Sequence, residues 1–86
     1  MGEFRVTVRL PESLRSRGVA SLVIDSPVAN LSELATALRA RSPKFAKADR
    51  SIYNFAVNGQ LVVHEEDSTP IRSGDEVEIV VVFAGG

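Results

Sequence analysis

The apolar run at residues 77–83 restricts the fold of this chain more than any other feature. It reads Val-Glu-Ile-Val-Val-Val-Phe and leads directly into Ala84, Gly85 and Gly86. A strand that is apolar at nearly every position is typical of the middle of a sheet. We therefore expect a central strand that delivers two residues without side chains, and then a free carboxylate, to the edge of the domain.

Size and composition fit a single domain over residues 1–86. The chain has 86 residues, of which 44% are hydrophobic and 24% charged, as in ordinary soluble globular proteins. The absence of cysteine excludes disulfides, thiolate nucleophiles and zinc–thiolate sites. A formal net charge of −1 gives no indication of nucleic-acid or lipid binding. Without a signal-peptide pattern or a membrane-length apolar stretch, we expect a cytoplasmic protein with no membrane contact.

The first half of the chain predicts two strands and a helix. Residues 4–10 and 19–25 alternate between apolar and polar positions, which indicates two half-buried strands joined by the loop at 11–18. Asn30 is a favourable helix N-cap, and Glu33 stands three residues later in the capping-box position. The helix has one apolar stripe, consisting of Leu31, Leu34, Ala35 and Leu38. We expect Pro43 to end it.

The second half predicts three more strands. Residues 52–57 are strand-like, Asn58-Gly59 is a hairpin turn signal, and residues 61–63 would return as a short strand. A tight turn at 73–75 launches the final strand. One helix on one face of a mixed sheet of about five strands is an α+β arrangement. With the last strand parallel to the first, this would be a β-grasp, or ubiquitin-like, fold.

This order and the segment 71–86, IRSGDEVEIVVVFAGG, resemble the ubiquitin-like sulfur carriers. That family includes the small subunit of molybdopterin synthase and the sulfur carrier of thiamine biosynthesis. The resemblance spans the whole chain. Its most specific part is a Gly-Gly pair at the end of the sequence, after a Gly-Asp-Glu-Val turn and an apolar strand.

The resemblance implies that the chain is a carrier rather than an enzyme. An E1-like enzyme would adenylate the C-terminal carboxylate with ATP and magnesium, so the carrier would bind no cofactor itself. Sulfur from a persulfide donor would displace AMP and leave a thiocarboxylate on Gly86, with Gly85 as its necessary neighbour. A sulfur-accepting catalytic subunit would be the second partner.

The chemistry of the tail agrees with this role. An α-carboxylate has a pKa of about 3.5, so it is ionised at neutral pH and is a poor electrophile until another protein activates it. Glycines without Cβ atoms can enter a narrow channel in conformations closed to other residues.

The sulfur acceptor stays open. The length and the loop at 11–18 favour the molybdopterin type, but Val81-Val82 stands where that type often has Pro-Pro. The Ala-Gly-Gly ending is common in the thiamine type. Carriers for cysteine synthesis or tRNA thiolation, a protein modifier, and a plain interaction domain with an incidental Gly-Gly are the alternatives.

The final strand also predicts a docking face. Val77, Ile79, Val81 and Phe83 share one parity, which we expect to face the helix. The opposite face would be open to solvent and carry two exposed valines rimmed by charge, unless a loop covers them. We expect the partner-binding residues to be Val80, Val82, Phe83 and Ala84.

The remaining polar candidates have simpler interpretations. His64, the one histidine, stands beside Glu65, Glu66 and Asp67, which we interpret as a solvated acidic loop rather than a metal site. Five arginines are interpreted as solubilising surface charges, with contact to an acidic partner surface left open: Arg15, Arg17, Arg39, Arg41 and Arg50.

Overall fold

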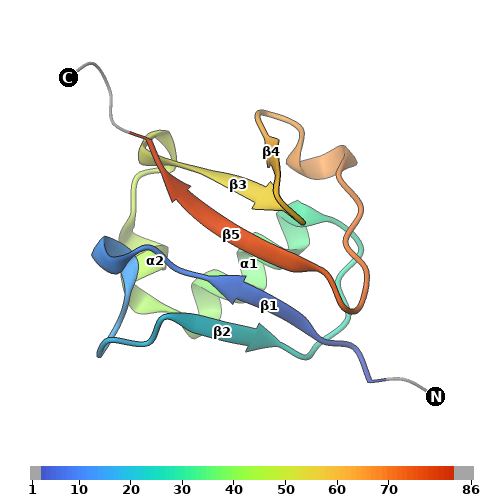
Figure 1. Cartoon of the computed structure of the whole chain (residues 1–86), viewed down its shortest axis with the longest axis horizontal. Helices are drawn as coiled ribbons and strands as arrows, with labels where there is room; N and C mark the ends of the chain where they lie inside the picture. Colours follow the sequence, from blue (N-terminus) through green and yellow to red (C-terminus); the bar gives the residue numbers. More distant parts are fainter. Residues whose placement is uncertain (1–2, 83–86) are drawn as a thin grey trace.

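A computed structural model describes residues 3–82, which form a five-stranded sheet with one main helix against one face (Figure 1). The strands are β1 (Val6–Arg9), β2 (Ser21–Ile24), β3 (Tyr53–Val57), β4 (Gln60–Val62) and β5 (Glu76–Val81). The α-helices are α1 (Leu31–Arg41) and α2 (Pro43–Lys47). Three short 3-10 turns are η1 (Glu12–Leu14), η2 (Arg50–Ile52) and η3 (Glu66–Ser68).

The strands lie in the order β2-β1-β5-β3-β4, so the last strand of the chain is the central one. β5 pairs in parallel with β1 and antiparallel with β3, while β1–β2 and β3–β4 are antiparallel hairpins. Val8 stands opposite Val77 in the parallel pair, and Phe55 stands opposite Ile79 in the antiparallel pair. The prediction of an α+β β-grasp fold, with the first and last strands parallel, is confirmed.

Helix α1 begins as the sequence predicts. The Asn30 side chain accepts a hydrogen bond from the Glu33 backbone N–H at 2.9 Å. The Glu33 carboxylate reaches back one residue further than a capping box requires and accepts from the Ala29 N–H at 2.8 Å. The whole predicted apolar stripe is buried against the sheet: Leu31, Leu34, Ala35 and Leu38.

Helix α1 ends at Arg41, before Pro43, as the sequence predicts, and Pro43 then begins a second short helix, α2. The Ser42 hydroxyl accepts a hydrogen bond from the Phe45 N–H at 3.3 Å and so caps the second helix. Proline is favoured at this position because the first helical N–H needs no partner within the helix.

Helix α2 brings an aromatic ring into the core. The ring of Phe45 lies 4.9 Å from that of Tyr53 and 6.3 Å from that of Phe55, centroid to centroid, and all three side chains are buried. Tyr53 and Phe55 meet edge to face at 5.5 Å. Such tilted pairs suit the quadrupoles of aromatic rings. The cluster fixes α2 and the start of β3 at one end of the sheet.

Two turns set the register of the sheet. Asn58 and Gly59 have φ values of 50° and 84°, as a two-residue type I′ hairpin requires. This turn places Gln60 opposite Val57, so β4 begins one residue before the predicted segment 61–63. Gly74 has φ 94°, and its N–H donates to the Arg5 carbonyl at 2.7 Å, which ties the turn before β5 to β1.

The strands are shorter than the patterns predicted. β1 and β2 occupy the inner parts of the predicted segments 4–10 and 19–25, because their pairing extends over four residues only. β5 ends at Val81, and Phe83, which was predicted to belong to it, lies outside the described residues.

Replacing Leu34 by alanine tests the α1–sheet packing. Leu34 has no exposed surface, so Leu34→Ala should lower the free energy of unfolding by about 2–5 kcal/mol through lost burial and a residual cavity. Urea denaturation followed by circular dichroism measures the change. Leu61→Ala is the control, because that side chain is 55% exposed and its loss should change stability by less than about 0.5 kcal/mol. Equal losses for the two variants would contradict this packing.

Candidate functional site

The end of β5 is held firmly in the sheet. Tyr53 of β3 stands opposite Val81, and the Val82 N–H donates to the Ile52 carbonyl at 2.7 Å. The residues that follow are outside the described part of the chain: Phe83, Ala84, Gly85 and Gly86. The roles predicted for these four therefore stay predictions. The structure does determine where the chain leaves the sheet, which is beside η2.

The two faces of β5 differ as the alternation predicts. Val77 and Ile79 are each 1% exposed and belong to the core beneath the sheet. Glu78 is exposed on the other face, Val82 is 41% exposed, and Val80 is half-buried rather than fully exposed as expected. Val80 loses surface because it lies between paired strands, opposite Asn54 of β3. We call Val80 and Val82 the valine pair.

The open face carries further groups beside the valine pair. Ala56 and Leu61 stand opposite each other on β3 and β4, and Leu61 is 55% exposed. Small Ala56 helps to line a hollow of about 340 Å³, bordered by charged side chains. Its charged neighbours are Arg9, Glu76 and Glu78, of which Arg9 and Glu76 form an exposed ion pair of 3.1 Å. The face is therefore apolar toward the end of β5 and charged toward its start.

Ile52 is a neighbour of Val82 that the sequence did not reveal. Its carbonyl accepts the bond from Val82, and its side chain is 38% exposed. The sequence placed Ile52 at the start of a strand, where its exposure could not be inferred. Its position in η2 adds a third accessible apolar side chain at the end of β5.

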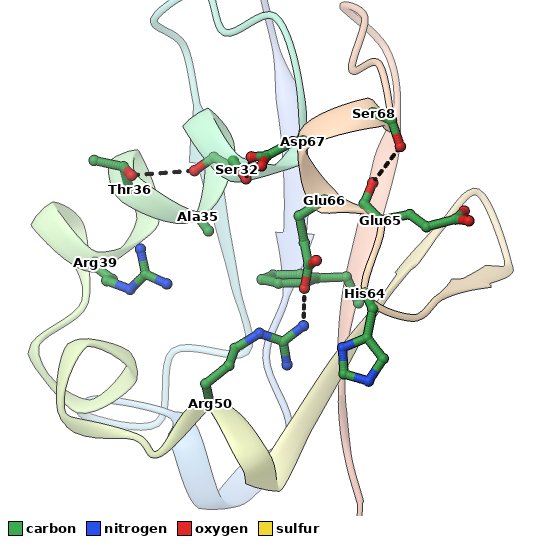
Figure 2. A pocket seen from close by; sticks show the side chains of 11 residues that line it. Ser32, Ala35, Thr36, Arg39, Arg50, His64, Glu65, Glu66, Asp67 and Ser68 are labelled. Atoms are coloured by element: carbon green, nitrogen blue, oxygen red, sulfur yellow. Dashed lines mark hydrogen bonds and ion pairs between the residues drawn. The ribbon is translucent and has the colours of Figure 1, made fainter.

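A second candidate site is the cleft between α1 and the segment 64–68 (Figure 2). It encloses about 480 Å³. Arg50 crosses it with its guanidinium 4.8 Å from the Tyr53 ring centroid and 5.4 Å from that of Phe55. The same group donates to the Tyr53 carbonyl and pairs with Glu66. Arg50 is thus a half-buried structural residue, and its interpretation as a solubilising surface charge is wrong.

The hydroxyl groups of this cleft are engaged in holding the fold. Ser32 donates to the Asp67 carboxylate, Thr36 to the Ser32 carbonyl, and Ser68 to the Glu65 carbonyl. Each of these bonds fastens a turn of α1 or η3. Nucleophilic catalysis needs a hydroxyl bonded to a base, and His64 makes no such bond with these hydroxyls among the described residues. We therefore assign the cleft a structural role.

The electrostatics of the cleft have one clear feature. The hydrogen bond from Arg50 holds the pKa of the Glu66 carboxyl below its usual range, against the opposing effect of burial.

Within residues 3–82, no group of three or more His, Asp or Glu side chains is placed to hold a metal ion. Over the same residues, no helix is both long and apolar enough to cross a bilayer.

The Arg50–Glu66 pair should make stability depend on pH. A lowered folded-state pKa means that the ionised form of Glu66 stabilises the fold, fully above the unfolded pKa of about 4.3 and progressively less as pH falls through the folded value. Glu66→Gln should therefore cost about 1 kcal/mol near neutral pH and less at about pH 3. Urea midpoints at both pH values measure this. Glu65→Gln, at an exposed neighbouring position, is the matched control. If Glu66→Gln lowered the free energy of unfolding as much in acid as near neutral pH, the ion pair would be excluded as the cause.

The comparisons with known proteins agree with this geometry. The model of the family described as the ThiS family matches residues 8–86. A search of curated proteins gives no match. Two solved structures share the fold, and both are less than a quarter identical in sequence.

The first is a chain from the complex of subunits 1 and 2 of the molybdopterin-converting factor of Helicobacter pylori 26695. It has a TM-score of 0.68 and 22% identity, over 96% of this chain and 100% of that one. The second is the solution structure of the Haloferax volcanii HVO 2177 protein, with a TM-score of 0.72 and 24% identity, over 99% of this chain and 89% of that one. With a family model that covers all but the first seven residues, and with the β-grasp sheet described above, the chain belongs to the ThiS family of ubiquitin-like sulfur carriers.

Proposed function

We propose that this chain carries sulfur as a thiocarboxylate on Gly86. The observation that carries the proposal is the family match, which runs through the last residue of the sequence, together with the anchoring of β5 up to Val82. A rigid strand that ends at the sheet edge gives a short tail a fixed point of departure. Gly85 and Gly86 then supply the slender tail that an enzyme channel can admit.

The proposed chemistry begins with activation. The Gly86 carboxylate attacks the α-phosphorus of ATP on an E1-like enzyme, and magnesium pyrophosphate leaves. The product is a mixed anhydride with AMP, which makes the acyl carbon electrophilic. In this step the chain is a substrate, and the activating enzyme binds the ATP and the magnesium ion and supplies the catalytic groups.

Sulfur transfer follows. A persulfide on a donor protein attacks the acyl carbon and expels AMP, so that an acyl disulfide joins donor and carrier. A thiol then attacks the donor sulfur of that disulfide, becomes oxidised to a new disulfide, and releases the thiocarboxylate. The thiocarboxylate sulfur then bonds to the acceptor, and water hydrolyses the acyl–sulfur bond, so that the sulfur stays on the acceptor and Gly86 regains its carboxylate.

We propose the molybdopterin precursor as the acceptor, with this chain as the small subunit of the synthase. The support is that the Helicobacter pylori chain of the same fold belongs to a complex of two molybdopterin-converting subunits. The second candidate is the thiazole of thiamine, which the ThiS description of the matching family favours. The two candidates share the chemistry of Gly86 and differ only in the acceptor.

The valine pair is the surface that we assign to partner docking. Val82 is accessible one residue after β5, and Val80 lies two residues earlier, within β5. Apolar side chains at this point add buried area to any partner that has the tail in its channel. The proposal extends this surface to Phe83 and Ala84, which follow Val82 in the sequence.

Deleting Gly86 tests the carrier chemistry. The untagged protein is incubated with E1-like enzymes, ATP, magnesium and a persulfide donor, and its intact mass is measured. We expect a gain equal to the mass difference between one sulfur and one oxygen atom. The variant without Gly86 should show no gain, because the acyl group then sits on a residue that the channel does not position.

A chain extended by one serine after Gly86 is the matched control for that experiment. It keeps both glycines but replaces the reactive carboxylate by an amide, so it should also stay unmodified. Circular dichroism should show that both variants fold like the parent. Mass gain in either variant would contradict the assignment of Gly86.

Val82→Glu tests the docking surface. A carboxylate in place of this valine should raise the KM for the carrier in the activation assay by about tenfold, since it must be desolvated against an apolar partner surface. Turnover at saturation should change little. Val63→Glu is the control, because Val63 is 45% exposed but lies beyond β4, two strands from β5. If the two substitutions raised this KM equally, the valine pair would not be part of the interface.

A further inference from the structure

The topology gathers positive charge at the end of the domain where β5 finishes. β1 runs parallel to β5, so the connection after β1, residues 10–20, lies at that end. β3 runs antiparallel to β5 and begins opposite Val81, so the segment that precedes it, with α2 and η2, lies there too. Figure 1 shows η1, α2 and η2 on the side to which the β5 arrow points.

The sequence segments at this end are unusually basic. Residues 10–20 and 39–53 contain seven of the ten Lys and Arg residues of the chain but two of its eleven Asp and Glu residues. Arg41 pairs with Asp25 at 3.8 Å, and Arg50 pairs with Glu66. Glu66 neutralises Arg50, and Asp25 follows β2 at the opposite end of the sheet, where β5 begins, so Arg41 directs its charge away from the end where β5 finishes.

Five cations remain, and we call them the basic end: Arg15, Arg17, Arg39, Lys44 and Lys47. Among the described residues, no carboxylate oxygen lies within 4.0 Å of any of their charged nitrogens. Four of the five are exposed, and the fifth, Arg15, is half-buried.

Two of these cations are held in place. The Arg15 Nε donates to the Leu10 carbonyl at 3.0 Å, and the Arg39 guanidinium lies 5.9 Å from the ring centroid of Phe45. Side chains that are already positioned lose less conformational entropy when a partner binds them.

The two acids of the same segments do not cancel this charge. Asp49 accepts hydrogen bonds from the backbone N–H and the hydroxyl of Ser51 at 2.9 and 2.8 Å, which also lower the pKa of its carboxyl. Glu12 lies in η1. Within these two segments, the five cations of the basic end outnumber the two carboxylates by three.

The rest of the chain is acidic. Nine of the eleven Asp and Glu residues lie outside the two segments, with only Arg5, Arg9 and Arg72 as cations. The net charge of −1 therefore conceals an uneven distribution of charge along the chain, in which Glu65, Glu66 and Asp67 share a cleft with Arg39, and Glu78 shares a hollow with Arg15. The electric field of a charged partner orients a protein with such an uneven charge distribution before the two make contact.

We infer that the basic end docks on an acidic protein surface that surrounds the channel for the tail. This inference rests on the proposed function and adds to it the charge of the partner. Asp and Glu side chains at the mouth of that channel would attract the basic end and repel the opposite end, so that the tail arrives first. A nucleic acid is a poorer complement, because its phosphates extend beyond the basic end and would meet the carboxylates of the rest of the chain, whereas an acidic patch on a protein can match the basic end alone.

The first test is kinetic and uses the activating enzyme that modifies the chain in the mass assay. Lys44→Gln/Lys47→Gln removes two positive charges from the basic end. Arg72→Glu changes the net charge by the same amount at an exposed position of the opposite end, and is the matched control. At low ionic strength we expect kcat/KM to fall about tenfold for the lysine variant and less than twofold for the control, with kcat unchanged in both.

Salt dependence identifies the cause. The difference between the parent and the lysine variant should vanish at an ionic strength of about 0.5 M, where charges are screened over a few ångströms. A loss that persisted in salt, or an equal loss in the Arg72→Glu control, would overturn the inference.

The second test is independent of any enzyme. An octaglutamate peptide is titrated into the ¹⁵N-labelled protein and backbone amide shifts are followed by NMR. We expect salt-reversible shifts confined to residues 15–18 and 39–51, and their loss in the lysine variant. If the mass assay fails but the peptide still causes shifts confined to these residues, the proposed function is rejected and the basic end is kept as a binding surface. Shifts spread over the whole chain would reject the basic end as a binding surface.

Two alternative partners of the basic end are tested in the same series of experiments. Sedimentation at low salt would reveal a second copy of the chain, whose acidic side is also complementary to the basic end. An oligoribonucleotide is titrated at an ionic strength of about 0.15 M, where non-specific phosphate contacts are weakened. Self-association abolished by the lysine variant, or tight RNA binding, would overturn the assignment to an acidic protein partner.

Discussion

β5 is paired along both edges, and the position of every other element follows from that arrangement. Its parallel neighbour β1 brings β2 with it, and its antiparallel neighbour β3 brings β4. The inward side chains of β5, Val77 and Ile79, form part of the core against which α1 packs. The same strand thus organises the core on one face, carries the valine pair on the other, and sets where the tail leaves. The fold and the proposed docking surface therefore share one element.

Much of this architecture was predictable because its signals are local. The Asn30 cap, the Asn58-Gly59 hairpin and the turn at Gly74 act over two to four residues, and each appears in the structure where the sequence placed it. The alternation along 77–83 correctly placed Val77 and Ile79 in the core, but Val81, expected on the same face, is half-buried outside the core, and pairing with β3 covers part of Val80. Parity describes which way a side chain points and carries no information on how much its neighbours cover it.

The failures of sequence reasoning arise where residues far apart in the chain meet. Arg50 has its partners at Tyr53, Phe55 and Glu66, so its burial depends on a loop that closes over it from another part of the fold. The sequence left contact between the arginines and an acidic partner open, but it could not show that they gather in one region. A sum over the sequence gives a charge near zero, and only the pairing of β5 with β1 and with β3 brings the connection after β1 and the segment before β3 to one end. A gathering of charge of this kind is a property of topology.

The bond between Val82 and Ile52 has a mechanical consequence. A partner that draws the tail into a channel applies tension along the axis of β5, and the backbone bonds to β1 and β3 lie across that axis. Tension in this direction loads the bonds of both ladders together, as shear, instead of peeling them apart one at a time from a free edge. The Val82 bond stands at the end where the load enters. A central strand is therefore a strong attachment for a tail that is pulled, so a partner of the proposed kind could draw on the last residues without unfolding the domain.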